Sequence, residues 1–144
     1  MKEWLLLIYK VPSRPTSSRV YVWRKLKQIG ALLLHDSVWL LPANDRTHEQ
    51  FQWLAAEITE LRGEAMLASA DFRMIEQEKA LTTRFQEQAD KVYRQVLSGL
   101  KEKKRDLTSL SRQFQQAQAV DFFQSKLAGP AREALLAARE GQSQ

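Results

Sequence analysis

The first 75 residues alternate between short β-type runs and segments with helical spacing, and this order restricts the fold more than any other feature. The run Trp4–Lys10 is apolar almost throughout, which is typical of a strand buried on both faces. Pro12 and Pro15 follow it and predict a loop, because proline cannot donate a hydrogen bond to a sheet. Helical spacing then extends to about Ile29, and Gly30 is suited to end that helix.

Two short strands, a second helix and a fourth strand are predicted next. They are Ala31–His35, Val38–Pro42, a helix with the stripe Phe51, Leu54, Ile58 and Leu61, and Ala65–Met74. The expected N-caps are Ser17 or Ser18 for the first helix and Asp45 or Thr47 for the second. The resulting order predicts an α+β fold, a ferredoxin-like βαββαβ domain over residues 1–75 with an antiparallel sheet.

From residue 76 to residue 144 the apolar residues follow helical spacing, which predicts a helical C-terminal extension. The stripes on either side of Lys101–Arg105 favour a helical hairpin that turns near Gly99–Lys104, because each stripe then covers the other. A single long helix across this polar stretch is the alternative. Pro130 suits the first turn of a short terminal helix.

Composition excludes several kinds of chemistry. The chain has no cysteine, so it cannot form thiolate nucleophiles or zinc–cysteine sites. His35 and His48 are the only histidines, and neither has the partners of a metal site, so we predict no metal, no cofactor and no catalytic residue. No segment reaches the about 18 apolar residues that span a bilayer, and no signal peptide is recognisable. We therefore expect a cytoplasmic protein without a membrane partner.

The net charge of +5 is concentrated in two basic regions that flank an acidic middle. Phosphate contact requires only exposed positive charge, so these regions are candidate DNA-binding sites. The predicted contact residues are Arg14, Arg19, Arg24, Lys25, Lys27, Lys103, Lys104, Arg105 and Arg112. The alternative is that both clusters are solvated surface.

Four tryptophans are numerous for a chain of 144 residues. Trp4, Trp23, Trp39 and Trp53 are candidates for a platform on which bases stack. Large aromatic residues more often fill a core or a dimer seam, and we favour that interpretation.

Several of these segments together resemble the N-terminal domain of the chromate-resistance regulator ChrB, and more distantly the last domain of PaaX-type repressors. The segments that carry the resemblance are Trp4–Pro12, Ser18–Lys27, Gly30–Leu34, Ser37–Pro42, Phe51–Leu54 and, near the end, Asp121–Phe123. Their order and spacing agree over nearly the whole chain. The resemblance implies a DNA-binding transcriptional regulator of a chromate-resistance operon, in which this domain contacts the operator DNA.

ChrB proteins usually carry a second, C-terminal domain, so the resemblance implies that a separate domain or protein senses the effector. Selective binding of chromate by this chain alone is not expected. Without cysteine, only arginine, lysine and backbone donors could bind chromate, and they would bind sulfate in the same way. We also expect a homodimer, since a four-stranded sheet leaves open edges.

The predicted fold and Ser37-Val38-Trp39 also resemble the small nuclease-like subunit of the CRISPR adaptation complex. In that family the first strand ends in an aspartate that helps to hold a metal ion, whereas the matching residue here is Lys10. An ammonium group cannot ligate Mg²⁺. We therefore predict that the chain is not an enzyme, and the main alternative to DNA binding is a dimeric protein-interaction module.

Overall fold

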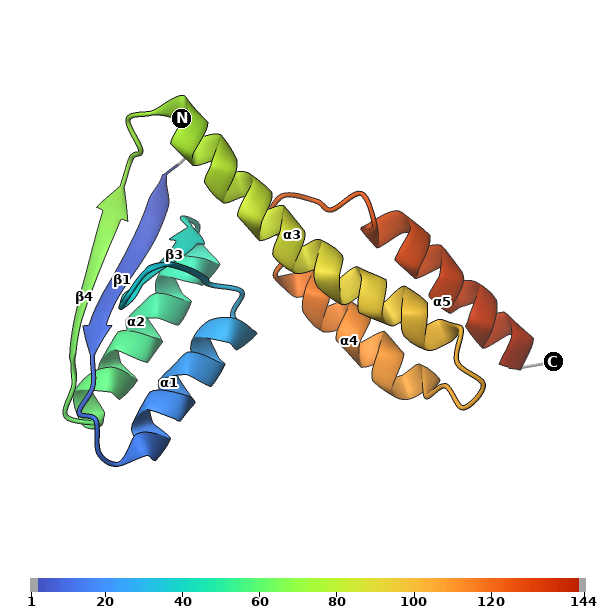
Figure 1. Cartoon of the computed structure of the whole chain (residues 1–144), viewed down its shortest axis with the longest axis horizontal. Coiled ribbons are helices and arrows are strands. Elements are labelled where there is room, and N and C mark those ends of the chain that lie inside the picture. Colours follow the sequence, from blue (N-terminus) through green and yellow to red (C-terminus); the bar gives the residue numbers. More distant parts are fainter. Residues whose placement is uncertain (1–2, 143–144) are drawn as a thin grey trace. The chain divides into compact units, whose positions relative to one another are not determined.

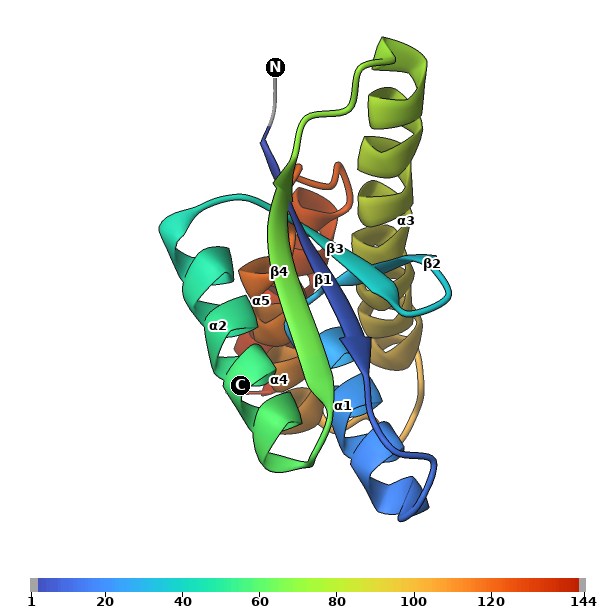
Figure 2. The same cartoon turned by 90° about the vertical axis from the view of Figure 1, so that its left-hand side faces the viewer.

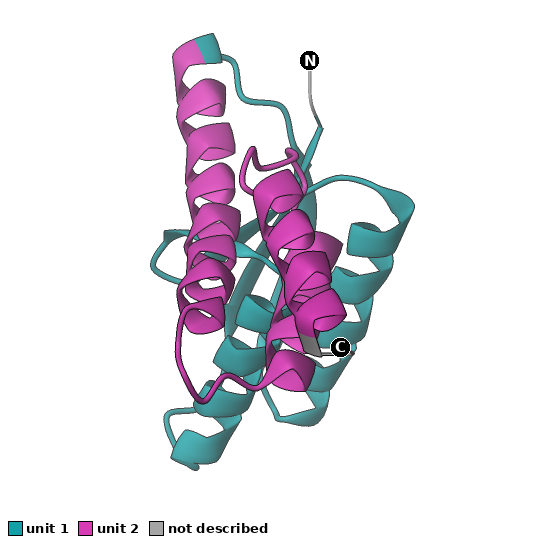
Figure 3. Ribbon diagram, turned by 90° about the vertical axis from the view of Figure 1, so that its right-hand side faces the viewer, with its two compact units in different colours: residues 1–75 teal, residues 76–144 magenta. Residues whose placement is uncertain are grey.

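A computed structural model of the chain describes residues 3–142. The chain divides into two compact units, residues 1–75 and residues 76–144 (Figure 3). Among residues 3–142, no helix is long and apolar enough to cross a membrane.

The first unit contains one antiparallel sheet with the strand order β2-β3-β1-β4. Its elements are β1 (Trp4–Lys10), α1 (Thr16–Gln28), β2 (Leu32–His35), β3 (Val38–Pro42), α2 (Asp45–Glu60) and β4 (Glu64–Ala70). Helices α1 and α2 lie on the same side of the sheet (Figures 1 and 2). The prediction of an α+β fold with a four-stranded antiparallel sheet is confirmed.

Strand β1 is central because it pairs with β3 on one side and with β4 on the other. Its neighbouring residues Trp4 and Leu5 point to opposite faces and are both buried, as the apolar run predicts. At its other end Ile8 is 38% exposed and Lys10 is exposed. Burial on both faces therefore holds only for the first half of the strand.

The two helices add to the core of this unit through apolar residues three or four positions apart. The buried members are Val22 and Leu26 of α1 and Phe51, Leu54 and Ile58 of α2. This spacing places them on one face of each helix. Leu61, which the predicted stripe of the second helix also included, is half-buried and follows the end of α2.

The starts of the two helices differ from the predicted N-caps. The residue before α1 is Pro15, and no side chain caps this helix. The residue before α2 is Asn44, whose Oδ1 accepts a hydrogen bond from Thr47 N at 2.8 Å, while Asn44 N donates to Thr47 Oγ1 at 3.0 Å. This is a capping box, in which Thr47 takes the third helical position.

The second unit consists of α3 (Ile75–Leu100), α4 (Leu107–Ala119) and α5 (Ala128–Gln142), with Ile75 at the boundary. The chain leaves the helical conformation between Leu100 and Leu107, so α3 and α4 form a hairpin. Helix α5 spans 15 residues and is longer than α4, although we expected a short terminal helix. All three helices supply one core, which includes Tyr93, Val96, Phe114, Ala131 and Leu135.

Gly63 lies between α2 and β4, where the backbone approaches the end of β1. A Cβ atom at this position would lie 2.4 Å from Lys10 O and 2.8 Å from Ile58 Cγ2. Gly63→Ala is therefore expected to lower the free energy of unfolding by about 1–3 kcal/mol, because backbone atoms have to move. Chemical denaturation measures this change.

Gly141→Ala is the matched control. Apart from its chain neighbours and its own helix backbone, no atom lies within 4 Å of its added Cβ, and alanine favours the helix, so the free energy of unfolding is expected to stay unchanged or rise by up to about 1 kcal/mol. Equal losses of stability in both variants would contradict the close approach at Gly63.

Candidate nucleic-acid interface

Helix α1 carries four of the nine predicted contact residues away from its buried stripe. Ser18, Val22 and Leu26 face the core. Of the basic residues, Arg19, Arg24 and Lys27 are exposed and Lys25 is half-buried. The helix contains no aspartate or glutamate, so its outer side has only positive formal charge. Arg14 lies exposed in the loop before it.

Exposed aromatic rings accompany the lysines of α1. Lys25 Nζ lies 5.7 Å from the centre of the Tyr21 ring, and Lys27 Nζ lies 5.8 Å from the ring of Trp23. Contacts of this kind hold an ammonium group over a negative ring face while it stays accessible to solvent. The rings therefore limit the positions of two of the basic groups on this surface.

The four tryptophans divide into two pairs. Trp4 and Trp39 are buried in the first unit, in agreement with the core interpretation. Trp23 is 52% exposed and Trp53 is 66% exposed, so these two are not in the core, and a place in a dimer seam stays a prediction for them. Each of these two tryptophans lies next to a buried residue of its helix, so its exposure is decided by a difference of one position along the helix.

A carboxylate adjoins the aromatic surface of α1. The hydroxyl of Tyr21 donates a hydrogen bond to Glu57 of α2. This bond, which requires the tyrosine proton, raises the pKa of Tyr21 above its ordinary value. Positive charge therefore dominates on α1 itself, while α2 adds a negative group at the border.

The basic residues of the α3–α4 turn have different surroundings. Lys103 and Lys104 are exposed in the turn. Arg105 instead donates a hydrogen bond from Nη1 to the carbonyl oxygen of Leu100 at 3.1 Å, and so satisfies an otherwise unpaired carbonyl at the end of α3. Arg112 is exposed on α4. Within residues 3–142, none of the nine predicted residues forms an ion pair with a carboxylate.

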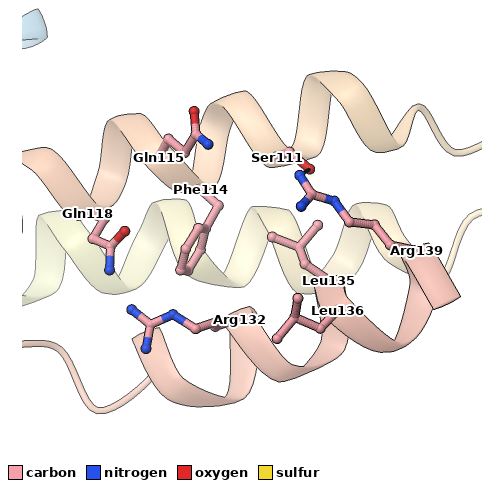
Figure 4. Close-up of a pocket in the computed structure, with 8 residues that line it drawn as sticks. All are labelled: Ser111, Phe114, Gln115, Gln118, Arg132, Leu135, Leu136 and Arg139. Carbon is pink, nitrogen blue, oxygen red and sulfur yellow. Dashed lines mark hydrogen bonds between the residues drawn. The ribbon is translucent and has the colours of Figure 1, made fainter.

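Two further arginines were not predicted. Arg132 and Arg139 of α5 lie beside a hollow between α4 and α5, together with Ser111 and Phe114 (Figure 4). They are seven residues apart and therefore share one side of the helix. The spacing of Arg132 and Arg139 can be read from the sequence, but the sequence does not show that α4 lies next to α5 and forms a hollow with them.

No group of three or more potential metal ligands occurs among residues 3–142. His35 Nε2 lies 3.2 Å from Asp36 Oδ2, and both side chains are more than 80% exposed in the turn between β2 and β3. Lys10 is exposed at the end of β1, where its register partner is Glu64.

Comparison with known proteins assigns the family. The model of a family described as Protein ChrB, N-terminal, matches residues 19–99, which is more than half of the chain. The chain belongs to the ChrB N-terminal family. A curated relative named Protein ChrB, from Cupriavidus metallidurans, is 31% identical over 90 residues. The aligned part covers 60% of this chain and 28% of that relative. No solved structure matches the chain.

The ChrB match begins within α1 and ends within α3. It includes Arg19, Arg24, Lys25 and Lys27, whereas Lys103, Lys104, Arg105 and Arg112 follow it. The basic cluster of α1 is thus the part of the predicted interface that lies inside the family region.

Beyond the family region, Asp121 connects α3 to the segment between α4 and α5. The Tyr93 hydroxyl donates to Asp121 Oδ2 at 2.9 Å, and Ser125 N donates to Asp121 Oδ1 at 2.9 Å. The Ser125 hydroxyl donates to Asp90 Oδ1. Phe122 and Phe123, which follow Asp121, both pack edge-on against Phe85. These contacts give Asp121–Phe123 a structural role.

Burial and the bond to Asp121 together raise the pKa of Tyr93 far above its usual value of 10.0. Tyr93→Phe is expected to lower the free energy of unfolding by about 1–3 kcal/mol at neutral pH, because Asp121 loses a donor. Tyr21→Phe, which removes an exposed hydroxyl, should leave the free energy of unfolding nearly unchanged.

The same pKa shift predicts a dependence on pH. The folded chain retains the Tyr93 proton at pH values where the unfolded chain loses it, so this stabilisation is complete below about pH 10 and declines above it. The difference between parent and Tyr93→Phe should therefore narrow as pH rises past about 10. Urea denaturation from pH 7 to 11 measures this, and a constant difference would contradict a shifted Tyr93.

Proposed function

We propose that this chain is a DNA-binding part of a transcriptional regulator of chromate resistance. Membership in the ChrB N-terminal family supports the pathway, because ChrB proteins regulate chromate resistance. The chain spans 28% of the length of its curated relative, so the whole regulator's effector response belongs to a separate domain or protein in this proposal.

The observation that carries DNA binding is the basic side of α1. Four basic side chains lie on a helix of 13 residues that has no acidic residue. DNA binding in its sequence-independent part depends on neutralised phosphates and released counterions, and exposed lysines and arginines supply both. The lysines over Tyr21 and Trp23 are partly ordered before DNA arrives, which reduces the entropy lost on binding.

We assign the first unit to the ferredoxin-like class and infer that it acts as a homodimer without catalysis. The element order βαββαβ and the central position of β1 between β3 and β4 support the class. Strands β2 and β4 are at the two edges of the sheet, where unpaired backbone groups favour pairing with another copy. A twofold dimer presents two copies of the α1 surface, as operators with repeated half-sites require.

A protein-interaction module is the second candidate, and the exposure of Trp53 favours it. Trp53 borders a hollow of about 200 Å³ between α1 and α2, which Lys25 and Ile29 also line. Exposed tryptophans beside an apolar hollow are typical of protein interfaces. A gel-shift experiment with DNA from upstream of the protein's own operon separates the two candidates, because only the first predicts a shifted band.

Replacement of both Arg24 and Lys27 by alanine is expected to weaken binding to DNA. It should also reduce the steepness of the plot of log affinity against log salt concentration by about two, because each phosphate that is no longer neutralised accounts for about one unit. Titration of operator and random duplexes over a salt series measures the slope. Replacement of Arg46 and Arg73, which are exposed outside both clusters, is the matched control and should leave the slope unchanged. If both double variants gave the same slope of log affinity against log salt, α1 would not be part of the DNA interface.

Replacement of Lys103 and Lys104 by alanine should weaken binding to all duplexes alike, because an exposed turn contacts backbone rather than base edges. Arg105→Ala should in addition lower the free energy of unfolding by about 0.5–1.5 kcal/mol, since Leu100 loses its hydrogen bond. Thermal denaturation measures both effects, and the change in stability of the lysine variant should be near zero. A lysine variant that binds every duplex as tightly as the parent would exclude the turn from the interface.

A further inference from the structure

A groove between α4 and α5 has no part in the proposed function except through Arg112, which is one of the predicted DNA contacts and lies at its edge. It contains a hollow of about 150 Å³ whose lining includes Phe114, Arg132, Leu136 and Arg139 (Figure 4). A second hollow of about 370 Å³ shares Arg139 with the first and is also lined by Arg112. The two hollows therefore form one continuous groove, and both of its walls belong to the second unit.

The charge of this groove has one sign. Three arginines line it, and no aspartate or glutamate does. The guanidinium of Arg132 lies 5.7 Å from the centre of the Phe114 ring, and Arg139 Nη2 donates a hydrogen bond to Ser111 Oγ at 2.7 Å. Both side chains are thus positioned at the groove by contacts with α4, which favours recognition of a fixed pattern of anionic groups.

The apolar part of the groove lies between the two arginines of α5. Leu136 is 50% exposed there, and the buried side chains of Phe114 and Leu135 also line this part (Figure 4). Arg132 and Arg139 are seven residues apart, which corresponds to about 10.5 Å along a helix. A ligand that matches this surface has two anionic groups at this separation and an aliphatic surface between them.

We propose that the groove binds an acidic amphipathic helix of a partner protein, with two carboxylates two turns apart and leucine-like side chains between them. A helix with acidic residues at positions i and i+7 has the same spacing as the two arginines. Guanidinium groups pair well with carboxylates, because both are planar and can form two parallel hydrogen bonds.

Other ligands match the groove less well. The first hollow is smaller than the roughly 300–1,000 Å³ of a site that encloses a small molecule. The second, of about 370 Å³, is at the lower end of that range and is not lined by Phe114 or Leu136. A DNA backbone has phosphates but no apolar surface for Leu136. A second copy is a weaker match, because its Glu133 and Glu140 have the required spacing but are each adjacent to an arginine.

The test uses the full chain and two labelled synthetic peptides. The acidic peptide is a helix of alanine and glutamine with glutamate at positions i and i+7 and leucine at i+3 and i+4. The basic peptide has lysine in place of both glutamates. Fluorescence anisotropy at low salt should show at least tenfold tighter binding of the acidic peptide, and equal binding of both peptides would overturn the proposal.

The variant R132E/R139E should reverse this preference and bind the basic peptide more tightly. Such a gain cannot result from unfolding, and R132E alone should reduce the preference if the double variant is unstable. R94E/K126E changes two exposed positions outside the groove and should keep the parent's preference. A preference that survives R132E/R139E would overturn the proposal.

Two further measurements test whether the groove instead binds DNA or a second copy of the chain. Duplex DNA that displaces the acidic peptide from the parent and from R94E/K126E alike would assign the groove to DNA and overturn the proposal. Light scattering in which R132E/R139E alone changes the molecular mass would assign it to a second copy, with the same consequence. An unchanged mass and no displacement by DNA are the expected results.

Discussion

The first unit depends on the pairing of β1 with strands on both sides. Leu5 and Leu7 pair with Leu41 and Trp39 of β3, so the four side chains share one face of the sheet, and all are buried. A one-residue slip of β1 would move Leu5 and Leu7 to the opposite face, so their burial supports the register that the hydrogen bonds set. Helix α1 follows β1 directly in the chain. The basic side of α1 is therefore attached to a sheet whose central strand has none of the predicted contact residues.

The elements could largely be predicted because hydrophobic spacing is a local property. The run Trp4–Lys10 and the stripe of Phe51, Leu54 and Ile58 are sufficient for a strand and a helix. The helix starts could not be predicted as well, since several residues near Asn44 can accept the capping bond and the choice depends on backbone geometry. Thr47 illustrates this, because its hydroxyl also donates to Pro42 O at 2.6 Å and so connects α2 to the end of β3. Such a bond depends on contacts with an element outside the helix.

The candidate site shows the same limit. Charge in the sequence locates Arg24 and Lys27, because exposed basic residues on an amphipathic helix lie opposite its apolar stripe. Charge does not separate Arg105, whose guanidinium binds the Leu100 carbonyl, from Lys104 beside it. Trp23 and Trp53 were expected in a core or a dimer seam, and each lies one residue outside its helix's buried face and is exposed in the single chain. A shift of one position on a helix turns a side chain by about 100° and decides between core and surface.

The two cationic surfaces differ in chemistry, and this difference bears on their partners. On α1 two lysines lie over aromatic rings, and an ammonium group is a compact charge that accepts many directions of approach. A phosphate backbone, which presents charge repeatedly and without one fixed geometry, matches such a surface. Between α4 and α5 the charges are guanidinium groups positioned by Phe114 and Ser111. Because a guanidinium donates in fixed directions, the groove selects the geometry of its ligand as well as its charge. In the two proposals, DNA contacts the basic side of α1 and the α3–α4 turn, whereas a partner helix contacts the guanidinium groups between α4 and α5, so the two ligands are matched to cationic groups of different chemistry.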